Sequence, residues 1–192
     1  QRLAERADAM ALMLAASQRE RQAIRYAALM HDVGKIGVPE RVLLKRGALN
    51  EWERGRMREH VRLGAEIVSR IEALADVAAL IYHHHERYDG TGYPDGLGGE
   101  RIPLGARILA AVDAYDALTN PRPYRQPLAP EQALRVIDEE SGKQFDPRVV
   151  ALLRAIVGAE KAHRATGGAD GRDKGAALVA TRIPARQPVR HA

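Results

Sequence analysis

Six histidine and aspartate side chains have the chemistry to bind divalent metal ions: His31, Asp32, His60, His84, His85 and Asp113. Imidazole and carboxylate groups together suit borderline cations such as Fe, Mn or Zn, so this set favours a metal centre. Two neighbouring ions can activate a water and clamp a phosphoryl oxygen. The chemistry that the set suggests is therefore hydrolysis of a phosphodiester.

The two adjacent pairs, His31–Asp32 and His84–His85, are suited to contact more than one ion. Consecutive residues on a helix differ in direction by about 100°, so such a pair can straddle two ions, and a carboxylate can bridge them. Each residue also has an ordinary interpretation when it is taken alone. A single histidine such as His60 is more often a surface or core residue, and His31 can simply lie near the negative end of a helix. Both interpretations stay open at this level.

Composition limits the class of protein. The chain has 192 residues, of which 45% are hydrophobic and only 4% aromatic, a profile that suits helices better than a β-sandwich. The absence of cysteine excludes a disulfide framework and a thiolate metal site. No run of about 18 apolar residues is present, so we expect no membrane span and a cytoplasmic location.

Apolar periodicity and capping residues predict an all-α domain of about seven helices. Helices are expected over 3–16, 17–32, 50–71 with a break at Gly64, 76–85 and 103–118, and from 130 and 147 onward. Ser17 and the pair Asn50 and Glu53 are candidate helix caps. The stretch 38–49 and the glycine-rich stretch 88–102 are expected to be loops, and a long ordered loop is usually functional.

An ordered series of motifs resembles a known family. The segment HDVGK at 31–35 resembles the HD-x-G-K motif of the HD-GYP family, and HHERYDGTGYP at 84–94 resembles its HHE-to-GYP signature. The pattern continues through Asp113, the segment RPYR at 122–125 and the segment FDP at 145–147. It covers roughly residues 2–156, and a series in this order is very specific.

The resemblance implies an HD-superfamily helical bundle with a long GYP loop. It also implies metal-dependent hydrolysis of cyclic di-GMP to linear pGpG and, in some members, on to GMP. The six residues above are expected to ligate two or three divalent ions, Fe or Mn, with Asp32 as the bridge. Asp32 and Lys35 are the expected catalytic residues, since the Lys35 ammonium can follow charge on the scissile phosphate. Substrate contacts are expected from Lys35, Tyr93, Pro94, Arg122 and Arg125.

The resemblance also sets the expected boundaries and partners. We expect the domain to span 1–157, with a first helix truncated at its N-terminus, because a further family His ligand would fall just before Gln1. The Gly-, Ala- and Arg-rich stretch 158–192 is expected to be a disordered tail. An upstream sensory or receiver domain and a GGDEF-domain protein are candidate partners. A nucleic-acid polymer is not expected, because much of the +5 net charge comes from that tail.

Other interpretations remain beside the phosphodiesterase for cyclic di-GMP. One is a catalytically weak or inactive module that senses cyclic dinucleotides or docks a protein, and another is a phosphodiesterase for cyclic GMP-AMP. The GYP loop with Tyr93 can also be a plain turn that covers a helix end. Glu86 and Asp89 are weaker candidates for proton transfer or for orienting the ligating imidazoles, and Glu86 equally for a surface salt bridge.

Overall fold

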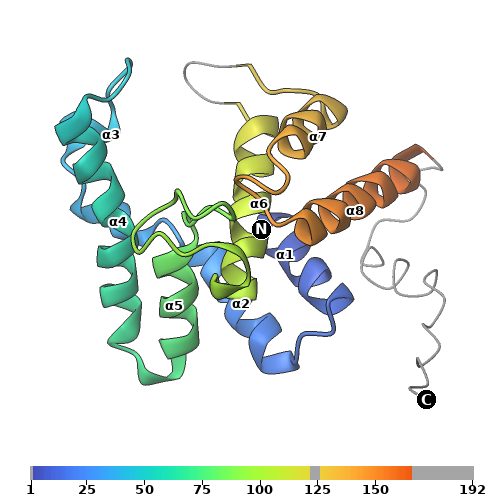
Figure 1. The fold of residues 1–192 in the computed structure, drawn as a ribbon, viewed down its shortest axis with the longest axis horizontal. Helices are drawn as coiled ribbons and strands as arrows, with labels where there is room; N and C mark the ends of the chain where they lie inside the picture. Colours follow the sequence, from blue (N-terminus) through green and yellow to red (C-terminus); the bar gives the residue numbers. More distant parts are fainter. Residues whose placement is uncertain (1, 122–125, 166–192) are drawn as a thin grey trace.

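The computed structural model describes residues 2–121 and 126–165, which form helices joined by loops (Figure 1). The eight α-helices of these ranges are α1 (Arg2–Met13), α2 (Gln18–Met30), α3 (Glu40–Leu43), α4 (Glu51–Ser69), α5 (Ala75–His83), α6 (Leu104–Thr119), α7 (Pro130–Glu139) and α8 (Pro147–Ala165). Short 3-10 helices lie at Val33–Gly37, Glu72–Leu74 and Gly99–Arg101. No β-strand occurs in the described ranges. The all-α prediction is confirmed.

Three boundaries differ from the prediction. The stretch 38–49 is not entirely loop, because it contains α3. Gly64 does not break α4, which continues through it to Ser69. Helix α8 runs to Ala165, so residues 158–165, expected to belong to the disordered tail, are helical. Glu160 on this last part of α8 accepts two hydrogen bonds from Arg6, both 2.9 Å long, which hold the helix against α1. The remainder of the predicted tail lies outside the described residues.

Helix α6 forms the centre of the core. It contacts α1, α2, α5, α7 and α8, so apolar residues occur on most sides of it and half of its residues are buried. The fully buried side chains of this core include Ile108 and Leu109 on α6 and Met10, Ile81 and Leu153 on other helices. A buried ion pair of 2.6 Å between Arg107 on α6 and Asp146 joins this core to the start of α8. No described helix has the length and apolar character that crossing a membrane requires.

The predicted helix caps are confirmed. The Ser17 hydroxyl accepts from the Glu20 backbone amide at 3.3 Å, and the Glu20 carboxylate accepts from the Ser17 amide at 2.8 Å. Asn50 and Glu53 make the same reciprocal pair at the start of α4, at 2.8 and 2.9 Å. These caps fix where α2 and α4 begin; the candidate ligands His31 and Asp32 follow the end of α2, and His60 lies on α4.

A close approach of two glycines sets the position of the HD segment. A Cβ atom on Gly34 would lie 1.9 Å from the His60 carbonyl oxygen and 2.5 Å from the Gly64 backbone nitrogen. Only glycine therefore lets the turn after α2 pack directly on α4. Helix α4 in turn packs along α5, beside which it lies in Figure 1. The ends of α2 and α5 and the middle of α4 are thereby brought to one place.

Candidate metal centre

All six predicted ligands converge at the junction of α2, α4, α5 and α6. His31 caps the C-terminus of α2, Asp32 follows it, and His60 lies in the middle of α4. The His84 ring is 5.4 Å from that of His31 and 5.5 Å from that of His60, centroid to centroid. His85 completes the imidazole group, with its centroid 5.1 Å from that of His60. The prediction that these side chains share one site is consistent with this geometry.

The two carboxylates connect the imidazoles. Asp32 turns one oxygen, Oδ2, toward His31 Nε2 at 3.6 Å and the other, Oδ1, toward His60 Nε2 at 3.9 Å. Asp113 Oδ1 lies 3.5 Å from the same His31 nitrogen. Lys35 donates to Asp32 Oδ2 at 2.7 Å, so an ammonium group lies at the edge of the cluster. The oxygens of Asp32 therefore face two different imidazoles.

Three of the imidazoles are oriented in the same way. Nδ1 of His31, His60 and His84 lies 3.1, 2.6 and 2.6 Å from the carbonyl oxygen three residues earlier in each case. A ring that donates from Nδ1 to a carbonyl keeps an unprotonated Nε2 with a free lone pair. This is the arrangement that commonly orients metal-ligating histidines. The helix geometry thus directs three lone pairs toward the centre of the cluster.

Two of these nitrogens are buried without a hydrogen-bond partner. Nε2 of His60 and Nε2 of His84 are inaccessible to solvent and hydrogen bond to no described residue. Leaving a buried polar atom unsatisfied costs about 1–3 kcal/mol. Ligand atoms of His60, His84 and His85 also all lie within 4.8 Å of one another. The donor set and the orphaned nitrogens therefore fit a bound divalent cation.

Burial keeps the inner imidazoles in the neutral form that a metal needs. It lowers the pKa of His60, lowers the pKa of His84 well below its ordinary value, and lowers that of His85 to about 4. His31 behaves differently. Burial opposes its charged form, but the carboxylates of Asp113 and Asp32 outweigh burial and raise its pKa. The cluster thus contains a neutral half and a half in which an imidazole faces two carboxylates.

The GYP loop is anchored by Glu86. The side chain of Glu86 is fully buried, and it accepts the backbone amides of Asp95 at 2.8 Å and Leu97 at 3.1 Å. The surface salt bridge considered for Glu86 is therefore wrong. Gly92 lies against the same segment, because a Cβ atom there would be 2.3 Å from the Arg87 backbone nitrogen. Glu86 thus holds the loop that follows the HHE segment.

Tyr93 contacts the candidate metal centre through the ring of His85. Its ring stacks on that of His85 with centroids 5.0 Å apart and an angle of 28°, and the Arg58 guanidinium lies 5.0 Å from the centroid of the same ring. Burial raises the pKa of Tyr93 well above its ordinary value, so the phenol stays protonated. Pro94 follows in a cis peptide bond and is exposed. Arg122 and Arg125 lie outside the described residues.

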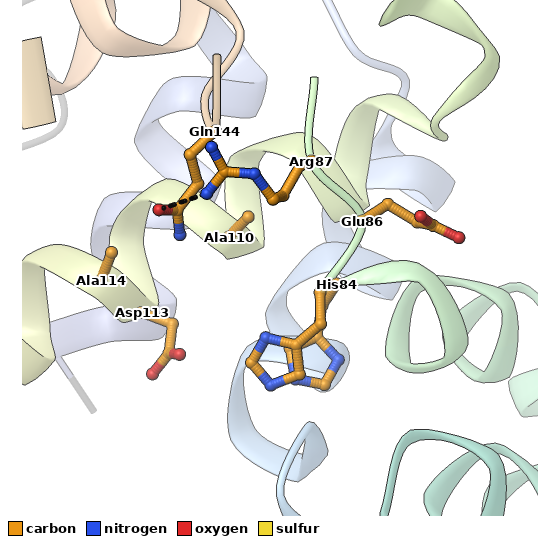
Figure 2. Close-up of a pocket in the computed structure, with 8 residues that line it drawn as sticks. His84, Glu86, Arg87, Ala110, Asp113, Ala114 and Gln144 are labelled. Atoms are coloured by element: carbon orange, nitrogen blue, oxygen red, sulfur yellow. Dashed lines mark hydrogen bonds between the residues drawn. The ribbon is translucent and has the colours of Figure 1, made fainter. Parts of the chain in front are cut away.

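A cavity of about 170 Å³ opens beside the cluster (Figure 2). Its lining residues are His84, His85, Glu86, Arg87, Ala110, Asp113, Ala114 and Gln144. Tyr93 and Pro94 are not among them. Arg87 lies within the HHERYDGTGYP segment and Gln144 directly precedes FDP, but no pattern in the sequence predicts that either residue lines a cavity. Figure 2 shows Glu86 pointing away from Asp113, in agreement with its contact to the loop.

A second, smaller group of potential ligands lies behind the HHE segment. His83 Nδ1 is 3.7 Å from Glu86 Oε1 and 4.0 Å from Asp95 Oδ2. Both Glu86 oxygens already accept backbone amides, and Asp95 is exposed. The Glu86 carboxylate of this group therefore anchors the loop and is not free to ligate a metal ion.

Comparison with known proteins identifies the family. The model of a family described as HD domain matches residues 1–149. The cyclic di-GMP phosphodiesterase response regulator RpfG of Xanthomonas campestris is 47% identical over 157 residues, which cover 80% of this chain and 42% of the relative. This chain belongs to the HD-GYP family. A 3'3'-cGAMP-specific phosphodiesterase of Vibrio cholerae is a further relative of this HD-GYP chain, 37% identical over 154 residues, 80% of the chain and 34% of the relative.

Solved structures support the HD-GYP fold. A cyclic GMP-AMP-specific phosphodiesterase of V. cholerae superposes with a TM-score of 0.65 at 20% identity, covering 95% of this chain and 48% of that one. An HD-GYP-like protein of Bdellovibrio bacteriovorus has a TM-score of 0.65 at 21% identity and covers 81% and 50%. The HD-GYP chain described here spans less than half the length of the curated relatives it matches.

Proposed function

We propose that this domain hydrolyses a phosphodiester bond of cyclic di-GMP and releases linear pGpG, in a reaction that depends on bound metal. The observation that carries the proposal is the convergence of six candidate ligands, two of which have a buried imidazole nitrogen without a hydrogen bond. Relatives named as cyclic di-GMP phosphodiesterases, 43–47% identical to this chain, support the choice of substrate.

The positions of the ligand atoms favour two ions with Asp32 between them. His60, His84 and His85 with Asp32 Oδ1 would hold one ion. His31 and Asp113 with Asp32 Oδ2 would hold the other. Mixed imidazole and carboxylate ligands suit Fe or Mn. When bound, such ions supply Lewis acidity that activates a water and offsets charge on the phosphoryl oxygens.

The chain's own residues supply positioning and charge. Carbonyl groups of α2, α4 and α5 keep the three Nε2 lone pairs directed inward, so little rearrangement accompanies binding. Lys35 is partly exposed at the edge of the cluster, where its ammonium can donate to a non-bridging oxygen of the scissile phosphate. Arg122 and Arg125 are proposed to clasp the other phosphate, and Tyr93 to stiffen His85 by stacking.

A second candidate substrate is cyclic GMP-AMP. Relatives of V. cholerae named as 3'3'-cGAMP-specific phosphodiesterases are 34–37% identical to this chain over most of the domain. The same centre serves either substrate, because both contain the same phosphodiester linkage. The two substrates are distinguished by the nucleobase contacts rather than by the metal ligands.

The proposal places the domain in the bacterial cytoplasm, within a longer signalling protein. The chain spans 42% of the relative named as a response regulator, which leaves room there for a receiver domain. A sensory or receiver domain is therefore the proposed upstream partner, and a GGDEF-domain protein a further one. A hydrolysis assay distinguishes this enzyme from the alternative, a non-catalytic sensing module.

The test is hydrolysis by metal-free protein reloaded with Fe(II) or Mn(II). Cyclic di-GMP and cyclic GMP-AMP are supplied separately, and chromatography resolves the linear dinucleotide from the mononucleotides. Asp32→Ala should lose both bound metal and turnover. Asp76→Ala is the matched control, because Asp76 pairs with Arg19 on the exposed surface. Full hydrolysis by Asp32→Ala would overturn the site assignment.

A further inference from the structure

The cavity of Figure 2 shares one wall with the candidate metal centre. The residues of its opposite wall are not candidate metal ligands. His84, His85 and Asp113 form the shared wall. Its volume of about 170 Å³ slightly exceeds that of an engineered cavity of about 150 Å³ that admits benzene. The cavity can therefore take one planar ring system directly beside the centre.

The remaining lining of the cavity has an apolar part, formed by two alanines, and a polar part, formed by Arg87 and Gln144. Ala110 and Ala114 are four residues apart on α6 and thus lie on one face of it, where their methyl groups leave room for a ring. Gln144 and Arg87 form the polar side. Such a combination of small apolar surface and few directed polar groups is typical of a ligand site.

Arg87 fixes the direction of the Gln144 amide. Arg87 Nη1 donates to Gln144 Oε1 at 3.1 Å. The rest of its guanidinium is held by Asp89 at 3.0 Å and by Glu140 at 3.2 Å, so it cannot turn easily. With its oxygen engaged, Gln144 presents its NH₂ group as a free donor. Figure 2 shows this nitrogen pointing away from Arg87, on the side of the cavity where Asp113 lies.

We propose that this cavity is the subsite for one guanine base of the substrate and that Gln144 selects guanine over adenine. Guanine offers two acceptors on one edge, O6 and N7, whereas adenine offers N7 beside an N6 amino donor. N7 accepts in both bases, so the selection depends on a Gln144 donor that faces position 6, where it matches O6 of guanine and opposes the N6 amino group of adenine. This inference rests on the proposed function, because it assigns a part of the same substrate.

The Gln144 side chain is not needed to hold the segment in place. Its backbone carbonyl accepts the Tyr88 amide at 3.1 Å, and the neighbouring Lys143 carbonyl accepts the Asp89 amide at 2.7 Å. These backbone bonds remain when the side chain is replaced. Variants at Gln144 should therefore fold and keep their metal, which makes the role in base selection testable.

The test compares Gln144→Glu with wild type. The glutamate keeps its contact with Arg87 but presents an acceptor in place of the donor. We expect the ratio of kcat/KM for cyclic di-GMP to that for cyclic di-AMP to fall on the order of tenfold or more, with metal content unchanged. Gln22→Glu is the matched control, since Gln22 lies exposed on α2, and it should leave the ratio unchanged.

Binding of mononucleotides separates this inference from the proposed function. Calorimetry should find that wild type prefers GMP to AMP and that Gln144→Glu loses this preference. If hydrolysis fails altogether but this pattern holds, the proposed function is wrong and the base subsite stands. If hydrolysis proceeds and both the kcat/KM ratio and the GMP preference survive in Gln144→Glu, or wild type shows no GMP preference, the subsite is wrong.

Discussion

Replacement of Gly34 by alanine tests how the fold positions the metal centre. The added Cβ atom would lie 1.9 Å from the His60 carbonyl oxygen, whereas ordinary contacts begin at 3.4 Å, so the HD turn must retreat from α4 by about 1.5 Å. Both obstacles are backbone atoms, so no side-chain rotation can relieve the clash. Overpacking of this kind costs about 1–3 kcal/mol, and we expect the upper end of that range.

The same retreat separates Asp32 from His60. Their nearest ligand atoms are 3.9 Å apart, and a metal site tolerates ligand displacements of only about 0.2 Å. Gly34→Ala should therefore lose metal as well as stability. Urea unfolding of the metal-free protein measures the first effect, and elemental analysis of the reloaded protein measures the second.

Gly55→Ala is the matched control on α4. A Cβ atom on Gly55 meets nothing within 4 Å, so this variant should gain roughly 0.5–1 kcal/mol from helix propensity and keep its metal. The two variants make the same chemical change in opposite environments. If Gly34→Ala unfolds at the same urea concentration as Gly55→Ala and binds metal fully, the glycine contact does not position the site.

Three further predictions concern pH, the loop and the tail. Because burial lowers the pKa of His85 from 6.5 to about 4, the folded metal-free protein binds fewer protons than the unfolded chain between these values. Titration of His85 alone should lower the stability by about 3 kcal/mol as pH falls through that window, and His85→Asn should flatten the slope seen in urea titrations. Glu86→Gln leaves one loop amide without an acceptor and should cost about 1–3 kcal/mol, with faster amide hydrogen exchange in 88–102, whereas the exposed Glu66→Gln should stay within about 1 kcal/mol of wild type. Removing residues 166–192 should leave cyclic di-GMP hydrolysis unchanged, and a large loss of activity in that assay would give the basic stretch a role in catalysis or binding.

Local signals account for the parts of the fold that the sequence predicted. The cap residues Ser17 and Asn50 act within one helical turn, so their hydrogen bonds can be anticipated from neighbouring residues. Helix α3 escaped prediction because its four residues are too few for periodicity to be visible. Glycine weakens helices, so the sequence predicts a break at Gly64. The structure shows instead that Gly64 packs against Gly34, thirty positions earlier, and a contact at this distance has no local signal.

In the candidate site too, the sequence predicts the motif residues but not the tertiary contacts around them. The ligands were predicted because the HD and HHE motifs give residue types and order, and the structure brings them together. The hydrogen bond from Arg87 to Gln144 joins residues 57 positions apart, so neither the segment that contains Arg87 nor the FDP segment that follows Gln144 predicts this contact. The role of Glu86 as the anchor of the GYP loop likewise depends on where the loop folds back. Tertiary contacts of this kind leave no local pattern in a single sequence.

The most direct test of the central claim is the location of bound metal. Crystals of protein reloaded with Fe(II) would be measured at the iron edge for anomalous scattering. We predict two peaks on either side of the Asp32 carboxylate, one beside His60, His84 and His85 and one beside His31 and Asp113. Peaks only at the group of His83, Glu86 and Asp95, or none at all in fully loaded protein, would contradict a metal centre bridged by Asp32.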